Sequence, residues 1–155
     1  MLVEFQKKGA KLQRAFSGAS QLAGEIKNRL ASIKRALGET ASPVDNLVSD
    51  ALSLDTRLNE IIRNFRGDQT RRSRNENSLP SIGDRVGKAV GDMSTSTSKP
   101  TQTARDAYDI ANAEFTTELQ KLRTLVEVDL KNLEQAAEAA GAPWTPGRVP
   151  EWKEQ

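Results

Sequence analysis

The sequence predicts an all-α fold: an elongated up-down bundle of three long helices plus one short helix, similar to a four-helix bundle. Apolar residues recur at alternating steps of three and four over most of the 155 residues, which is the spacing of amphipathic helices packed on one another. Hydrophobic residues make up only 36% of the chain and charged residues 28%, as suits helices that each bury one stripe. We expect the bundle over residues 1–141 and an extended tail rich in Pro and Trp over 142–155.

The first helix is expected over residues 2–37. Its apolar positions follow the steps of a left-handed coiled-coil seam, which also suits pairing with a second copy of the chain. They are Phe5, Leu12, Phe16, Ala19, Ala23, Ile26, Leu30, Ile33 and Leu37. Gly38 then suits the left-handed residue that ends many helices.

The second helix is expected over residues 43–66, with Ser42 as N-cap and Pro43 in the first helical position. The short connection makes it an antiparallel neighbour of the first helix. Its apolar positions are Val44, Leu47, Ala51, Leu54, Leu58, Ile61 and Phe65. We interpret Arg66-Gly67-Asp68, an integrin-type tripeptide, as a helix end closed by the glycine.

Residues 68–79 lack apolar periodicity and predict a loop. A short helix follows over residues 81–93, with Ser81 as N-cap and Asp84 three positions later. The sequence then predicts a polar linker over 94–100. Glycines repeat every four residues along the short helix, and we expect this face to pack closely on a neighbour such as Ala104, Ala107 or Ala111. The glycines are Gly83, Gly87 and Gly91.

The last helix is expected over residues 102–140, straighter than the first, and ended by Gly141. Its stripe is Ala104, Tyr108, Ala111, Phe115, Leu119, Leu122, Val126, Leu130, Leu133, Ala137 and Ala140. Residues 2–37 carry eight basic and two acidic side chains, and residues 104–140 carry four basic and eight acidic. Opposite charges favour contact between these two helices. The short helix forms either a fourth rod, which we favour, or an end-to-end continuation of the second helix.

Two groups of residues are candidate partner contacts. The first is an arginine cluster: Arg63, Arg66, Arg71, Arg72 and Arg74. With Lys7, Lys8, Lys11 and Arg14 it suits a polyanion or nucleic acid, but no aromatic residue interleaves it and the net charge is only +2, so nucleic acid is the less favoured partner. The second group is Trp144 and Trp152. They either fold back and bury large area at the bundle end or dock on a partner.

The composition argues against an enzyme. The chain has no His and no Cys, which removes the commonest general base, the best nucleophile and the usual zinc ligands. Two i,i+4 carboxylate pairs, Glu114 with Glu118 and Glu134 with Glu138, are interpreted as a solvated acidic face. We therefore expect no catalytic residues, cofactor or metal site, and we also expect no signal peptide. No membrane span is expected either, because no apolar run approaches the ~20 residues that a bilayer requires.

Four stretches of the second half carry a resemblance to a known family. They are RGDQTRRSRNE (66–76), PSIGDRVG (80–87), PTQTARDAYDIA (100–111) and AAGAPWTPGRVPEW (139–152). This region resembles the helical C-terminal segment of bacterial sortilin-like β-propeller proteins, the BNR-repeat, glycosyl hydrolase-like group. The resemblance implies an accessory module of a larger, exported protein, partnered by its β-propeller, and transfers no catalytic residue.

From these observations we predict a non-enzymatic helical interaction or scaffolding domain. Its partner is expected to be the β-propeller domain of the same parent protein, another protein, or a second copy of this chain. Polyanion or nucleic-acid binding through Arg63–Arg74 is the alternative.

Overall fold

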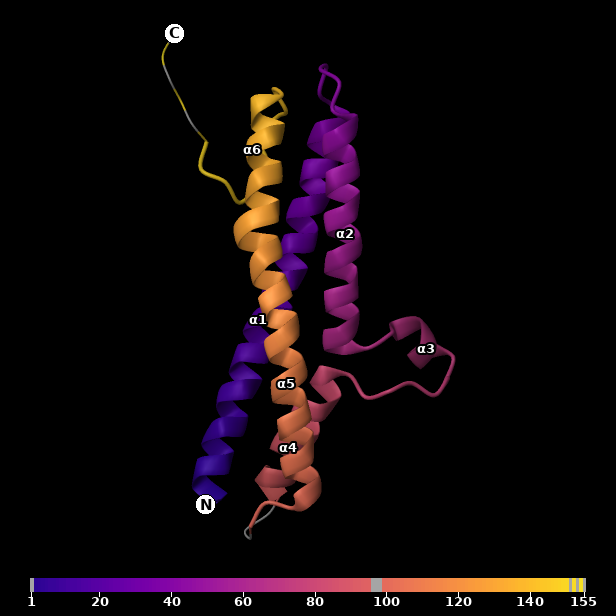
Figure 1. Cartoon of the computed structure of the whole chain (residues 1–155), viewed down its shortest axis with the longest axis vertical. Helices are drawn as coiled ribbons and strands as arrows, with labels where there is room; N and C mark the ends of the chain where they lie inside the picture. The colour runs from indigo at the N-terminus through magenta and orange to yellow at the C-terminus, as the bar shows by residue number, and fades with distance from the viewer. Residues whose placement is uncertain (1, 96–98, 151, 153, 155) are drawn as a thin grey trace. The chain divides into compact units, whose positions relative to one another are not determined.

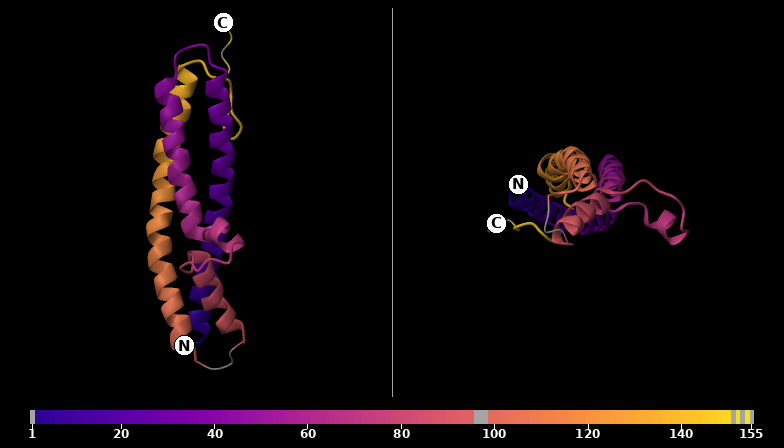
Figure 2. Two further views of the ribbon diagram at one scale, coloured as in Figure 1. Left: turned by 90° about the vertical axis from the view of Figure 1, so that its right-hand side faces the viewer. Right: turned by 90° about the horizontal axis from the view of Figure 1, so that it is seen from below.

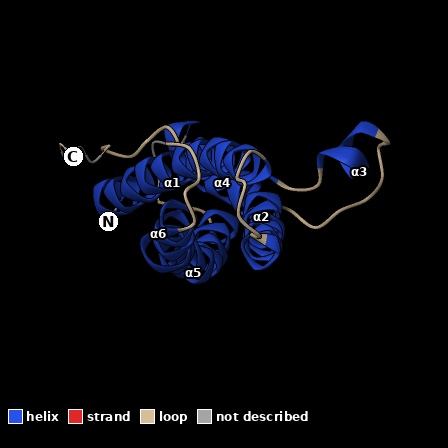
Figure 3. Cartoon of the chain, turned by 90° about the horizontal axis from the view of Figure 1, so that it is seen from above, coloured by secondary structure: helices blue, strands red, loops and turns tan. Residues whose placement is uncertain are grey.

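A computed structural model describes residues 2–95, 99–150, 152 and 154 of the chain. These residues form helices and loops and contain no strand, which confirms the predicted all-α class (Figures 1 and 3). The helices are α1 (Leu2–Gly38), α2 (Asp45–Arg66), α3 (Gln69–Ser73), α4 (Ile82–Thr95), α5 (Gln102–Thr124), the π-helical segment η1 (Leu125–Leu130) and α6 (Lys131–Ala139). Within the described ranges, no helix combines the length and apolar character needed to cross a bilayer.

The chain divides into two compact units. Unit 1 consists of Met1–Leu22 and Asn59–Leu122, and unit 2 consists of Ala23–Leu58 and Arg123–Gln155. Helices α1 and α2 each contribute residues to both units, as does the continuous helical stretch from α5 through η1 to α6.

Unit 1 is centred on aromatic rings. Phe16, Phe65 and Phe115 come from α1, α2 and α5, and their ring centroids lie 5.6–6.0 Å apart. Phe5 of α1 meets Tyr108 of α5 edge-on at 5.6 Å. Edge-on contacts of this kind add to the stabilisation that apolar burial supplies. They also confirm the predicted contact between the first and last helices in this unit.

Unit 2 is centred on aliphatic side chains. Its fully buried members come from α1, α2 and η1: Ile26, Leu30, Ile33, Leu37, Leu58, Leu125 and Leu130. The Lys34 ammonium lies 3.2 Å from the Asp55 carboxylate, so α1 and α2 are neighbours here, as predicted (Figure 2). Arg29 of α1 pairs with Glu134 of α6, which confirms contact of the first and last helices in this unit as well.

The start of α4 lies at the end of α2. A Cβ added to Gly83 would stand 3.0 Å from the Phe65 carbonyl oxygen and 3.2 Å from the Phe16 ring. This contact, within unit 1, matches the end-to-end alternative for the short helix. The expected glycine face was wrong for the rest of the helix, because Gly87 and Gly91 have open space beside them. Instead, the end of α4 approaches α1 closely at Gly9, where the absence of a side chain leaves room for the Met93 methyl group.

Several predicted boundaries were also wrong. Residues 68–79 are not all loop, because the Asp68 carboxylate caps α3 by accepting from the Thr70 and Arg71 amides at 3.0 and 3.4 Å. Helix α3 buries no residue, so periodicity gave no signal for it. Helix α2 begins at Asp45, two residues later than expected. Part of the predicted linker, residues 96–98, lies outside the described residues.

Glycine ends the helices at Gly67 and Gly141, which have φ angles of 82° and 84°. Gly38 differs from the expectation, since it is the last residue of α1 and is absent from the glycines with positive φ among the described residues. The end of α1 is closed instead by the Thr40 hydroxyl, which donates to the Ala36 carbonyl at 2.8 Å.

The π-helical segment η1 changes the face that the last helix buries. A regular helix would continue the stripe from Leu122 through Val126 to Leu130, as predicted. A π turn places residues five apart on one face, and accordingly Leu125 and Leu130 are fully buried while Val126 is only half-buried. The predicted stripe was therefore wrong at Val126, because Leu125 takes the buried place.

Candidate functional site

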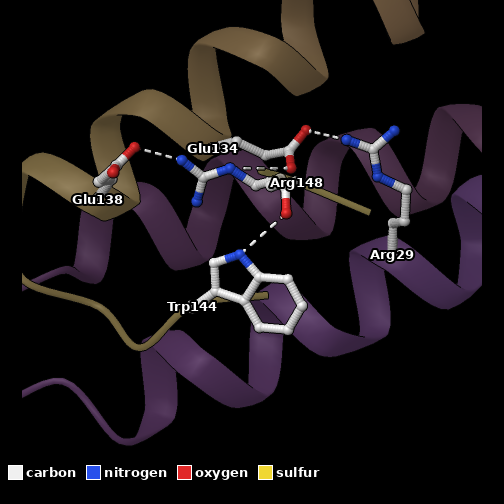
Figure 4. A network of polar contacts seen from close by, with 5 residues as sticks. All are labelled: Arg29, Glu134, Glu138, Trp144 and Arg148. Carbon is white, nitrogen blue, oxygen red and sulfur yellow. Dashed lines mark hydrogen bonds and ion pairs between the residues drawn. The ribbon is translucent and has the colours of Figure 1, made fainter. Parts of the chain in front are cut away.

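The tail residues 144–148 are bound to unit 2 through one arginine. The Arg148 guanidinium pairs with Glu138 and, at 3.5 Å, with Glu134, two residues one helical turn apart on α6 (Figure 4). Glu134 also accepts from Arg29 of α1 at 2.5 Å. The Glu134 carboxylate is 5% exposed and lies between two guanidinium groups, which compensate the cost of burying its charge.

The tail forms a tight turn at this anchor. The Trp144 indole nitrogen donates to the Arg148 carbonyl at 3.0 Å, which closes the turn. Gly147 has a φ of 90°, and an added Cβ there would lie 3.1 Å from Arg29 Nε, so the position favours glycine on both counts. Thr145 is buried at 5% exposure. The ion pairs that anchor the tail therefore come from Arg148 rather than from the tryptophans.

The two tryptophans remain exposed. Trp144 is 55% exposed and Trp152 is 88% exposed. The interpretation in which both fold back and bury large area is therefore wrong. Val149, between them, is 91% exposed. The tail presents apolar side chains on a backbone that Arg148 fixes at one end.

The five arginines of the predicted cluster have different surroundings. Arg72 donates to Asp84 at 2.7 Å and to the Ser81 hydroxyl at 3.4 Å, and Arg74 lies 3.8 Å from Glu76. Arg66 lies beside Arg72 in a shallow pocket next to Phe16 and Phe65. Arg63 and Arg71 instead line a different cavity of unit 1. The five side chains thus do not form one continuous basic surface.

Ser81 and Asp84 form the predicted cap of α4. The Ser81 amide donates to the Asp84 carboxylate at 3.0 Å, and the Asp84 amide donates to the Ser81 hydroxyl at 3.1 Å. Burial by itself raises the pKa of Asp84, but the hydrogen bonds from Ser81 and the Arg72 guanidinium outweigh it, so the pKa lies below its ordinary value. Arg72 is therefore occupied in holding the start of α4.

The cavity that Arg63 and Arg71 line has a volume of about 620 Å³ and also contains Arg85, Glu114 and Glu118. Glu118 is 7% exposed, and its Oε1 accepts from Lys121 at 3.0 Å. Its Oε2 is buried without a hydrogen-bond partner, as is Nε of Arg85. The walls carry both signs of charge, so the cavity offers donors and acceptors together.

Sequence reasoning missed the residues that matter most at both places. Glu118 and Glu134 were assigned to a solvated acidic face, but both are buried, whereas Glu114 and Glu138 are exposed as expected. Glu134 lies directly beside the buried Leu133, so its place at the edge of the apolar stripe was the available signal. Arg85 and Arg148 had no comparable signal.

In the described part of the chain, no group of three or more carboxylate side chains is placed to hold a metal ion.

No protein-family model, no curated protein and no solved structure matches this chain. The resemblance to sortilin-like proteins accordingly stays a prediction.

Proposed function

We propose that this chain is a non-enzymatic helical interaction module that contacts another protein through its tail. The proposed contact, the tail surface, consists of Trp144, Val149 and Trp152. The observation that carries the proposal is the anchor: Arg148 is held by Glu134 and Glu138 while Trp144 remains 55% exposed on the same turn.

The physical chemistry of protein interfaces supports this use of the tail. Tryptophan is enriched among the residues whose truncation most weakens protein complexes, because it buries a large rigid area. A side chain that is already positioned loses less conformational entropy on binding. The hydrogen bond from the Trp144 indole to the Arg148 carbonyl positions its ring before any partner arrives.

The helices serve, in this proposal, as the scaffold of the tail surface, arranged as a bundle. Contacts between α1 and α5 in unit 1 and between α1 and α6 in unit 2 support that arrangement. The resemblance to sortilin-like proteins supplies the partner class, a β-propeller domain of the same parent protein or of another protein.

The test compares partner capture by the unaltered chain and by two double variants. Trp144→Ala with Trp152→Ala removes the tail surface. Leu52→Ala with Val128→Ala is the matched control, because these apolar side chains are 53% and 49% exposed elsewhere in unit 2. Each chain is mixed with a β-propeller domain of the sortilin-like class, and binding is measured by calorimetry, with light scattering across a concentration series to detect self-association.

We expect the unaltered chain and the control to bind and the tryptophan variant to bind at least about tenfold more weakly. A concentration-dependent dimer that only the tryptophan variant loses would identify a second copy as the partner. Equal binding by all three chains, or by none in either assay, would contradict the proposal.

A further inference from the structure

The segment over residues 71–80 lies entirely at the surface of unit 1. All of its residues are exposed, and helix α3, whose end it includes, buries no residue. The Leu79 side chain, an apolar group of the kind that fills cores, is 88% exposed. In Figure 1, α3 lies to one side of α4. The segment can therefore change conformation without uncovering the core of its unit.

Few backbone hydrogen bonds hold this segment. Those between backbone groups of residues 71–76 close one turn, at 3.0–3.2 Å, and Asn75 turns the chain there with a φ of 55°. In the described part of the chain, residues 77–79 make no backbone–backbone hydrogen bond. Because the turn is exposed to water, its bonds can be exchanged for bonds to solvent. Exposed segments of this kind open locally at low free energy and are the preferred sites of proteolytic nicking.

Two arginines of the described chain lie outside the helices, Arg74 and Arg148. The Arg74 side chain is 68% exposed, and its ion pair with Glu76 is long, at 3.8 Å. The Arg148 side chain is only 19% exposed and is held by Glu134 and Glu138. A protease that selects arginine binds the guanidinium in its own pocket, so the side chain must be able to leave its partners. Of the two arginines, Arg74 meets this requirement.

The arginines within helices are less accessible to a protease. Arg71 and Arg72 belong to α3, and Arg72 donates to the Asp84 carboxylate at 2.7 Å. The remaining arginines of the described chain lie within α1, α2, α4 and α5. Cleavage beside any of these would first require a packed helix to open, which populates the cleavable form far less.

We propose that the Arg74–Asn75 peptide bond is a site of limited proteolysis by an arginine-specific endopeptidase. The reaction consumes one water. As the bond between the Arg74 carbonyl carbon and the Asn75 nitrogen breaks, the water hydroxyl joins that carbon and the remaining proton joins that nitrogen. Proton transfer between the new acid and the new amine then leaves a carboxylate on Arg74 and an ammonium group on Asn75.

The two products, residues 1–74 and 75–155, stay together in this proposal. In unit 1, the Phe16 and Phe65 rings of the first product lie 5.9 and 6.0 Å, between centroids, from the Phe115 ring of the second. In unit 2, ion pairs also join residues of the two products. Cleavage therefore gives a two-chain protein with the same helices. The tail surface lies wholly in the second product, so this inference is independent of the proposed function.

The test is a time course of the full chain with an arginine-specific endopeptidase at a low ratio of enzyme to substrate. Intact mass spectrometry identifies the first products, and size exclusion with light scattering sizes them without denaturant. We expect fragments 1–74 and 75–155 to form first and to elute together at the mass of the uncut chain. Arg74→Gln should slow the first cut about tenfold or more, because the next available bond lies in a helix.

The matched control is Arg14→Gln, which removes an exposed arginine within α1 and should leave the rate of the first cut unchanged. Circular dichroism establishes that both variants remain folded. Three results would overturn the proposal: a first cut at another bond, the same rate for Arg74→Gln as for the control, or fragments that separate on the column without denaturant.

Discussion

Unit 1 and unit 2 hold their helices together with different side chains. The four phenylalanines and the tyrosine all belong to unit 1, where rings from three helices meet. Unit 2 has an aliphatic core, and ion pairs cross between its helices: Lys34 with Asp55, Arg57 with Asp129 and Arg29 with Glu134. In unit 1, ion pairs join residues nearer in sequence: Lys88 with Asp92 within α4, and Arg72 of α3 with Asp84 of α4.

The difference bears on how each unit selects its helix register. Edge-on aromatic contacts depend on ring geometry and are insensitive to salt. Ion pairs between partly exposed side chains contribute only ~0–1 kcal/mol each and are screened by salt, but like charges in a wrong register are repelled. Unit 1 therefore depends on shape and unit 2 on charge as well as apolar burial. The following substitutions test this comparison, beginning with the largest expected effect.

Phe65→Ala should lower the free energy of unfolding by about 3–5 kcal/mol, because the ring is fully buried and contacts two other rings. Urea unfolding followed by circular dichroism measures the loss. Leu30→Ala, equally buried in unit 2, is the matched aliphatic control at about 2–5 kcal/mol. A loss below about 1 kcal/mol for Phe65→Ala would contradict the view that the aromatic contacts stabilise unit 1.

Glu134→Ala should lower the free energy of unfolding by about 1–3 kcal/mol, because Arg29 and Arg148 both lose their shared carboxylate. The side chains of Arg29 and Arg148 are 29% and 19% exposed, so hydration of the two arginines limits the loss. Glu138→Ala is the control, since that side chain is 51% exposed and its pair contributes ~0–1 kcal/mol. The comparison is made by urea unfolding at low and high salt, and equal losses for the two variants would count against a special role of the buried carboxylate.

The glycines of α4 provide a matched pair in unit 1. Gly87→Ala should raise the free energy of unfolding by up to about 1 kcal/mol, because it adds helix propensity in open space. Gly83→Ala should lower it by about 1 kcal/mol, because the new Cβ meets the Phe65 carbonyl oxygen at 3.0 Å. Thermal unfolding of both variants gives the sign directly. Stabilisation by both would mean that the start of α4 does not lie against the end of α2.

Asp84→Asn should lower the free energy of unfolding at pH 7 by about 0.5–1 kcal/mol, since the ionised carboxylate accepts from Ser81 and Arg72. The folded-state pKa of Asp84 lies below its unfolded value, so its charge stabilises above the unfolded pKa of about 4. That stabilisation is lost as pH falls through the folded pKa. Urea unfolding between pH 7 and pH 2 should therefore show the variant and the unaltered chain converging in acid, and a constant difference would contradict the assignment.

Much of the helical layout was predictable because it depends on local spacing. All seven predicted apolar positions of the second helix, from Val44 to Phe65, are buried. The Ser81 cap and the Gly67 and Gly141 stops were also predicted, since capping needs only neighbouring residues. The π-helical segment was missed, because Leu125 and Val126 are equally apolar and only packing selects between them.

The candidate site was predictable in part. Trp144 and Trp152 were identified as tail residues, and their exposure leaves them available for contact. The arginine cluster was identified as one group, but Arg72 and Arg74 are engaged by Asp84 and Glu76 while Arg63 and Arg71 line the cavity. Sequence proximity could not separate them, because the partner of each guanidinium depends on how the chain turns between α2 and α4.

The sequence by itself determined the helical class, most of the buried stripe and most helix ends, because each follows from spacing and capping within a few residues. Only the tertiary structure decided which charged groups meet. Arg29 and Glu134 stand 105 positions apart, and although Glu134 lies beside the buried Leu133, nothing local identifies Arg29 as its partner. Burying a carboxylate is costly unless a cation lies beside it, and the cations beside Glu134 come from Arg29 and Arg148, which only the folded chain brings to it.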